Sequence, residues 1–279
     1  MRTRGCLHAS PDIKNARARL ITASLSSYTG KDKAQVENLF LQFAVFPEDV
    51  LVPVGVLDAL APMWCERDTK RPHLKVRSWC TALIRCSLAK GSMLDGVNQH
   101  DIVRHFVITR HTDDTLRAMQ RNVVDALLAA RPAGGYPDHA PDGSLESYVA
   151  TSLWWHIRGS IGADDAVSMD LIEHKDNAVK SSLALAMGKE RLEKTVRSWE
   201  DKDDKLAAAK LCMIGRMLLD RGQISMGEHN ELVYRAVDLI TAVSSDETIE
   251  FEMEVLKCSA FLDVRNGPRE RGGESPTRE

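Results

Sequence analysis

Apolar residues recur at helical spacing along most of the chain. In the first half, apolar positions three or four residues apart predict helices, and turn-forming residues separate them. Thr112 can cap one of these helices, and Arg131-Pro132 ends it. The helices predicted for this half cover residues 12–24, 32–45, 54–64 and 72–86, a helical turn at 102–106, and the segment from 112 to 131.

One short segment breaks this helical pattern. Asp95-Gly96 stands between two strand-like runs, residues 87–94 and 97–102. Asp-Gly favours a two-residue hairpin turn, because both central residues of that turn need positive φ. A further extended stretch is expected at residues 51–54. Three helices followed by a two-stranded wing predict a winged helix.

The second half of the chain also reads as helical. Residues 132–144 hold three Pro and three Gly, and this predicts a linker between domains. Short helices joined by brief turns then indicate a helical-repeat-like array, although no clean repeat period is present. These helices are predicted at residues 145–159, 166–174, 176–186, 189–199, 202–221, 228–243 and 247–262.

The complete prediction is a mainly α protein. It comprises the end of a helical domain (1–24), a winged-helix domain with its following helix (25–131), the linker (132–144), the helical-repeat-like domain (145–264) and a disordered tail (265–279). The tail is rich in Gly, Pro, Arg and Glu.

Composition narrows the classes of function. The formal net charge is -3, so no overall positive field is present to hold a nucleic-acid backbone. The six cysteines form no Cys-x-x-Cys pair, and they are expected to be free thiols. The sequence has no secretory h-region and no apolar run long enough to span a bilayer. We therefore expect a cytoplasmic protein that does not enter a membrane.

Motifs for common catalytic or metal sites are incomplete. Thr29-Gly30-Lys31-Asp32 holds the Gly-Lys pair of a P-loop, but it lacks the earlier Gly and the final Ser or Thr. No Gly-x-Ser-x-Gly nucleophile motif is present. His100, His105 and His111 follow one another at spacings of five and six residues, which do not place two ligands on one helix face. No catalytic residue and no metal site are therefore predicted.

His100-Asp101, at the end of the hairpin, has two interpretations. In the first, it is a polar pair that closes the hairpin, with Asp101 capping the next helix. In the second, it is a nucleotide sensor, in which the imidazole N–H donates to a phosphate oxygen and Asp101 orients the ring. Residue chemistry alone favours the first interpretation.

The order of motifs around this pair resembles the winged-helix region of NB-ARC signalling ATPases, which belong to the STAND class. The segment from about Leu25 to Val107 carries the resemblance. Its matching pieces, in order, are Ser27-Tyr28, Phe43-Ala44-Val45-Phe46-Pro47-Glu48-Asp49, the helix from Leu57 to Trp64, the segment from Leu83 to Leu88, and Gln99-His100-Asp101 with Ile102-Val103-Arg104. Gln99 replaces the Met of the family's Met-His-Asp motif.

The resemblance implies that His100, supported by Asp101, contacts the β-phosphate of ADP in a complete protein. The nucleotide-binding core with its P-loop is missing upstream, so we expect a fragment or relic that is not an enzyme. This chain alone is expected to need no cofactor and to bind ADP or ATP weakly or not at all. The winged helix would contact the missing core, and the helical array would bind protein partners.

Two other functions remain open. A DNA-binding winged helix would use residues 72–86 as its recognition helix, with basic residues at Lys70, Arg71, Lys75, Arg77 and Arg85 and with Lys90 in the wing. The net charge and the apolar positions of that helix disfavour nucleic acid as a partner. An enzyme with an unrecognised site in the helical half would need a cleft with perturbed acids.

Overall fold

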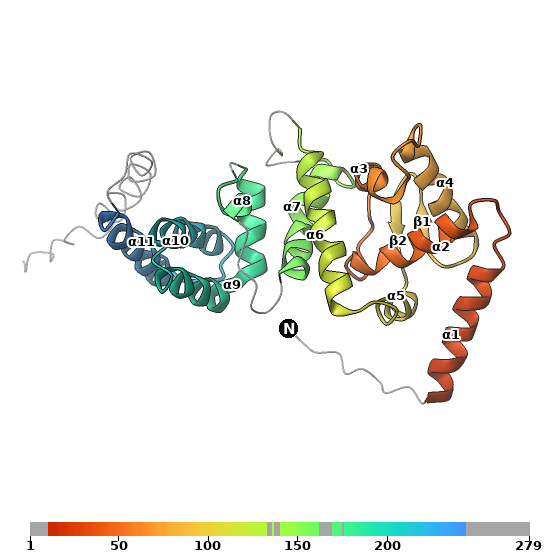
Figure 1. Cartoon of the computed structure of the whole chain (residues 1–279), viewed down its shortest axis with the longest axis horizontal. Coiled ribbons are helices and arrows are strands. Elements are labelled where there is room, and N and C mark those ends of the chain that lie inside the picture. Colours follow the sequence, from red (N-terminus) through yellow and green to blue (C-terminus); the bar gives the residue numbers. More distant parts are fainter. Residues whose placement is uncertain (1–10, 133–135, 137–139, 162–168, 175, 244–279) are drawn as a thin grey trace, which may run out of the picture. The chain divides into compact units, whose positions relative to one another are not determined.

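The computed structural model describes residues 11–132, 136, 140–161, 169–174 and 176–243. The chain is mainly α-helical, as predicted, and divides into two compact units. Unit 1 comprises Met1–Asp165 and Asp176–Ala186, and unit 2 comprises Ala166–Lys175 and Met187–Glu279. The elements (Figure 1) are α1 (Pro11–Ser26), α2 (Lys33–Gln42), the 3-10 turn η1 (Phe43–Val45), α3 (Val54–Trp64), α4 (Pro72–Arg85), β1 (Lys90–Ser92), β2 (Gly96–Asn98), α5 (Asp101–Ile108), α6 (Asp113–Ala129), α7 (Leu145–Ser160), α8 (Met169–Ile172), α9 (Asn177–Glu200), α10 (Lys205–Asp220) and α11 (Met226–Thr241).

Unit 1 is built around helices α2, α3 and α4. Helix α4 packs against both α2 and α3, while α6 packs against α3 and α7. Phe40, Leu57 and Leu83 are fully buried in this core. Burying such side chains stabilises the fold by about 1.5–3 kcal/mol each. The predicted helix boundaries at 54–64 and 72–86 agree closely with α3 and α4.

The hairpin forms, but the predicted two-residue turn at Asp95-Gly96 is wrong. Ser92 pairs with Gly96, so the loop is Met93-Leu94-Asp95. The Ser92 hydroxyl organises this loop, because it accepts from the N–H groups of Leu94 and Asp95 and donates to the Asp95 carboxylate at 2.7 Å. Local hydrogen bonding by Ser92 therefore replaces the expected turn geometry.

Gly96 has the positive φ that the sequence indicated, and its lack of a Cβ has a second consequence. Its φ is +108°, and a Cβ there would lie 2.9 Å from the carbonyl oxygen of Val52. Val52, in the predicted extended stretch, exchanges two backbone hydrogen bonds with Val97, of 2.8 and 3.0 Å. Gly96 therefore lets the Val52 backbone approach the hairpin closely.

The division into units differs from the predicted domain boundary at 132–144. Helix α7 belongs to unit 1, where it packs along α6 and buries Leu153 and Ile157. The first part of α9 also belongs to unit 1. Residues 132–144 connect α6 and α7, two helices that pack together within one unit. A high content of Pro and Gly does not distinguish such a connection from a linker between domains.

Unit 2 contains α8, the later part of α9, α10 and α11. Helices α10 and α11 pack so closely that a Cβ on Gly215 would lie 2.4 Å from Cδ1 of Leu232. Ser225 and Glu228 form a capping box at the start of α11. The predicted helices 202–221 and 228–243 correspond to α10 and α11. The predicted helix 247–262 and tail 265–279 lie outside the described residues.

Helix α9 contains a break at the predicted place. The sequence predicted separate helices at 176–186 and 189–199. Gly188, which lies inside α9, has φ 64° and ψ 174°, which is not a helical conformation.

Among the helices of the described residues, none combines the length and apolar character that a membrane crossing requires.

Candidate functional site at the start of α5

His100 and Asp101 lie where the hairpin leads into α5. His100 is the N-cap of this helix, with extended φ and ψ of -66° and 144°. Its Nδ1 accepts from the Ile102 N–H at 3.4 Å, and Asp101 Oδ1 accepts from the same N–H at 2.7 Å. The sequence placed the cap at Asp101, but the structure places it at His100, with Asp101 beginning the first turn. The two side chains also contact each other.

The His100 imidazole remains accessible, with 47% of the side chain exposed. It borders a hollow of about 300 Å³ between α1, the segment from Ser87 to Lys90, and the start of α5. Three basic side chains line the hollow: Arg17, Lys90 and His100. Its floor is apolar, with Ile21, Leu88, Ile102 and Val103 among the lining residues. Two cationic side chains, Arg17 and Lys90, with a histidine beside them and apolar residues between, suit an anionic group on a larger ligand, such as a phosphate.

Gln99, which immediately precedes His100, occupies an apolar environment. It is only 5% exposed, and neither Oε1 nor Nε2 has a hydrogen-bond partner within the described part of the chain. Burying an amide without partners is costly, by about 1–3 kcal/mol in protein mutational data. The buried position suits an apolar side chain better than it suits glutamine.

The segment from Phe43 to Asp49, part of the motif order described above, presents the carbonyl groups of Val45 and Phe46 to distant side chains. Gln120 Nε2 and Trp155 Nε1 donate to the carbonyl oxygen of Val45 at 2.9 and 3.0 Å. Arg104 Nε donates to the carbonyl oxygen of Phe46 at 2.7 Å, and its guanidinium lies 5.6 Å from the Trp155 ring centre. These side chains join α5, α6 and α7 to the end of η1.

A buried histidine completes this polar cluster. His156 Nδ1 hydrogen-bonds to Gln120 Oε1 at 2.6 Å, and Nε2 hydrogen-bonds to the Tyr148 hydroxyl at 2.8 Å. Burial lowers the pKa of His156 to about 3 and raises that of Tyr148. The histidine is therefore neutral at ordinary pH and serves as a structural connector. The members of this cluster come from three separate helices, so their positions in the sequence do not reveal it.

The described residues contain no group of three or more His, Cys, Asp or Glu side chains that could hold a metal ion. His111, one of the three histidines considered from the sequence, instead hydrogen-bonds through Nε2 to the carbonyl oxygen of Leu41 at 3.2 Å. His105 lies exposed near the end of α5.

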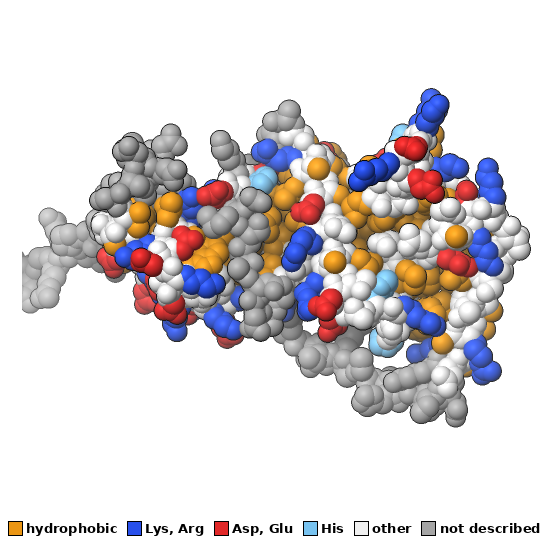
Figure 2. Space-filling model, in the orientation of Figure 1, with side chains coloured by type: hydrophobic (Ala, Val, Ile, Leu, Met, Phe, Trp, Pro, Cys, Tyr) orange, Lys and Arg blue, Asp and Glu red, His pale blue; other side chains and the backbone are white. Residues whose placement is uncertain are grey.

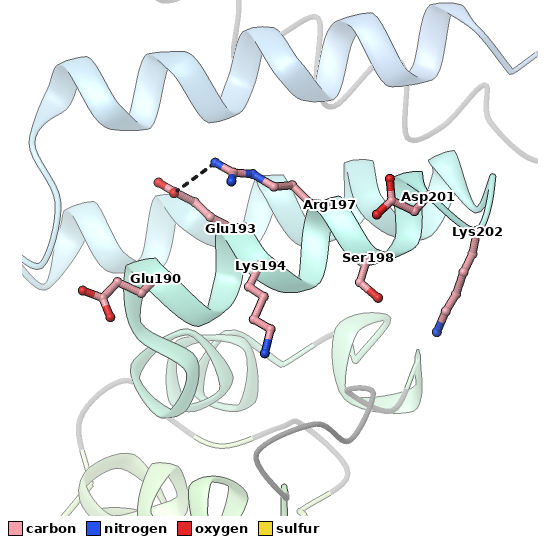
Figure 3. A pocket seen from close by; sticks show the side chains of 7 residues that line it. All are labelled: Glu190, Glu193, Lys194, Arg197, Ser198, Asp201 and Lys202. Carbon is pink, nitrogen blue, oxygen red and sulfur yellow. Dashed lines mark ion pairs between the residues drawn. The ribbon is translucent and has the colours of Figure 1, made fainter.

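A second hollow, of about 510 Å³, lies along α9 in unit 2 (Figure 3). Its lining combines both signs of charge, and Glu193 forms an ion pair with Arg197 at 3.9 Å. Such i,i+4 pairs are typical of a solvated helix face. The lining residues are Glu190, Glu193, Lys194, Arg197, Ser198, Asp201 and Lys202. Mixed charge without a buried polar group gives this hollow no clear ligand chemistry.

Comparison with known proteins adds no assignment: no family model, curated protein or solved structure matches this chain.

Proposed function

We propose that this chain is a non-catalytic regulatory and interaction segment of a STAND-class, NB-ARC-like signalling ATPase. In this proposal, the helices α2 to α4 with the β1–β2 hairpin act as a winged-helix sensor of nucleotide state. Unit 2 acts as a helical scaffold for protein partners in the cytoplasm. The chain hydrolyses no ATP, because its sequence lacks the P-loop that would hold the phosphates.

The observation that carries the proposal is the placement of His100. Its side chain caps α5, remains accessible, and borders the hollow that Arg17 and Lys90 also line. A histidine that only closed a hairpin would not need this basic, partly open surrounding. The position supports contact with a phosphate group, which the motif order around Gln99-His100-Asp101 also implies.

The alternative, DNA binding through α4, receives less support. Arg77 is engaged in a two-pronged interaction with Asp58, and Lys75 lies 4.0 Å from Asp32. On the face shown in Figure 2, basic and acidic side chains are interspersed. Retention on DNA that weakens with salt would favour this alternative.

Titration with a fluorescent ADP analogue tests the expected lack of nucleotide binding. The hollow beside His100 could contact a phosphate, but the chain lacks the nucleotide-binding core that would hold the rest of the nucleotide. We therefore expect no binding of the ADP analogue at micromolar concentration. Micromolar affinity of the chain alone would contradict the proposal.

A chimera tests the sensor role directly. We expect a STAND nucleotide-binding core fused before α1 to retain ADP, and His100→Ala to accelerate ADP release. His105→Ala is the matched control, because His105 is exposed on the same helix but does not line the hollow. Equal release rates for the His100 and His105 variants would refute a sensor role for His100.

A further inference from the structure

The break in α9 has a backbone conformation that only glycine adopts readily. Gly188 combines φ 64° with ψ 174°. Side chains disfavour this region because Cβ clashes with the local backbone. Among the described residues, and apart from its chain neighbours and the nearby backbone of its own helix, no atom lies within 4 Å of where a Cβ would be, so the constraint is local rather than a matter of packing.

The part of α9 before Gly188 is anchored in unit 1. The Asp176 carboxylate accepts from Arg131 Nε at 3.0 Å, from the Tyr136 N–H at 2.9 Å and from the Ala178 N–H at 2.9 Å. Val179 and Leu183, one helical turn apart, are fully buried. These contacts fix the start of the helix.

The part of α9 after Gly188 is anchored in unit 2. Lys189 forms an ion pair with Glu228, and Glu200 forms a two-pronged interaction with Arg235, both on α11. Leu192 and Val196 are fully buried. The two parts of one helix therefore belong to different packed bodies. The chain passes between the units at Asp165–Ala166, at Lys175–Asp176 and at Ala186–Met187, and the last of these crossings lies within α9, just before Gly188.

We propose that Gly188 is a hinge that permits units 1 and 2 to change their relative orientation. A change in the φ and ψ of this residue would redirect the later part of α9, and unit 2 with it, relative to the earlier part. Hinges are typically a few residues that absorb a large backbone change between rigid parts. A partner bound to unit 2 would shift the balance between such orientations if it bound one of them more tightly. This inference does not depend on nucleotide binding.

Single-molecule FRET on the full chain tests the hinge. Azide-bearing amino acids at Asn122 in α6 and Asp238 in α11, both exposed, carry the dyes and leave the native cysteines untouched. Gly188→Ala should shift the FRET distribution, because alanine must leave the observed φ and ψ. Inserting a second glycine after Gly188 should broaden it, because the connection gains freedom.

Gly143→Ala and Gly222→Ala are matched controls. Both glycines have positive φ, of 74° and 65°, and open space at the Cβ position, but neither lies between the two anchored parts of α9. Both controls should retain the wild-type distribution. The hinge is refuted if Gly188→Ala retains it too, or if the controls shift as far. Should Gly188→Ala fail to fold, an inserted-glycine variant no broader than wild type overturns the proposal.

Discussion

The hydrogen bond between His156 Nδ1 and Gln120 Oε1, at 2.6 Å, determines which nitrogen of a completely buried imidazole carries the proton. Gln120 Nε2 donates to the Val45 carbonyl, which leaves Oε1 to accept from His156. The proton of the neutral ring is therefore on Nδ1, and Nε2 accepts from the Tyr148 hydroxyl. One amide thus connects η1, α6 and α7.

Gln120→Leu is expected to destabilise the protein by about 2–4 kcal/mol, because it leaves the buried His156 Nδ1–H without an acceptor. Urea unfolding followed by tryptophan fluorescence measures the change in the free energy of unfolding. Asn122→Leu, at an exposed position on the same helix, is the control and should change it by less than about 0.5 kcal/mol. Similar values for both variants would show that the network contributes little.

The same network predicts acid sensitivity. Burial lowers the pKa of His156 to about 3, below its ordinary value near 6.5. Between these values the unfolded chain binds a proton that the folded protein excludes, so stability falls as the pH decreases from about 6.5 toward 3. The contribution of one such group is about 1.4 kcal/mol per pH unit.

Unfolding free energies of the wild type and His156→Gln, measured across this pH range, isolate the effect from that of the carboxylates. Although the variant should be less stable near neutral pH, the difference should narrow as the solution becomes more acidic. A constant difference would mean that His156 does not resist protonation in the folded state.

Gln99→Met should stabilise the protein by about 1–2 kcal/mol, because it removes a buried amide that has no partner. The control is Gln120→Met, at a similarly buried position, where both Oε1 and Nε2 of the amide are hydrogen-bonded and their loss should be destabilising. Thermal unfolding of the two variants should therefore shift in opposite directions. Loss of stability in both variants would indicate that Gln99 has a partner in solution.

Gly159→Ala tests how closely α6 and α7 pack. A Cβ on Gly159 would lie 2.8 Å from Cγ of Gln120, so the amide would be displaced from His156 and Val45, at a cost of about 1–3 kcal/mol. Gly227→Ala, in the first turn of α11, meets no atom closer than 3.9 Å and should instead be slightly stabilising. Chemical denaturation compares the two. A neutral Gly159→Ala would mean that Gln120 can move without losing its hydrogen bonds.

Local sequence signals predicted the local elements well. Thr112 accepts from the Thr115 N–H as the expected cap of α6, and Val54–Trp64 is helical over the expected range. The hairpin was found from Asp95-Gly96, but its loop was wrong, because hydrogen bonds from Ser92 and the approach of Val52 decide its geometry. The geometry of such a loop depends on side-chain hydrogen bonds and tertiary contacts, which the dipeptide Asp95-Gly96 alone does not reveal.

The surroundings of the candidate site were less predictable. His100 was identified from its motif, but Arg17 and Lys90 join it only because α1 and the hairpin meet at the same hollow. Likewise, the Val45 carbonyl receives donors from Gln120 and Trp155, which are remote in sequence. The sequences of α6 and α7 show that Gln120 and Trp155 can donate hydrogen bonds, but they do not show that the Val45 carbonyl oxygen is the acceptor. Residues that act together across helices therefore require the folded chain.

The pairing of Val52 with Val97 bears on when unit 1 can fold during synthesis and on how unit 1 responds to proteolysis. Both α3 and α4 lie between Val52 and Val97 in the sequence. This pairing therefore cannot form until the hairpin has left the ribosome. A single protease cut in the exposed loop at Glu66–Asp68 would leave two fragments joined by the two Val52–Val97 hydrogen bonds and by the packing of α3 on α4. Unit 1 would then persist as a nicked, non-covalent complex rather than separate at once.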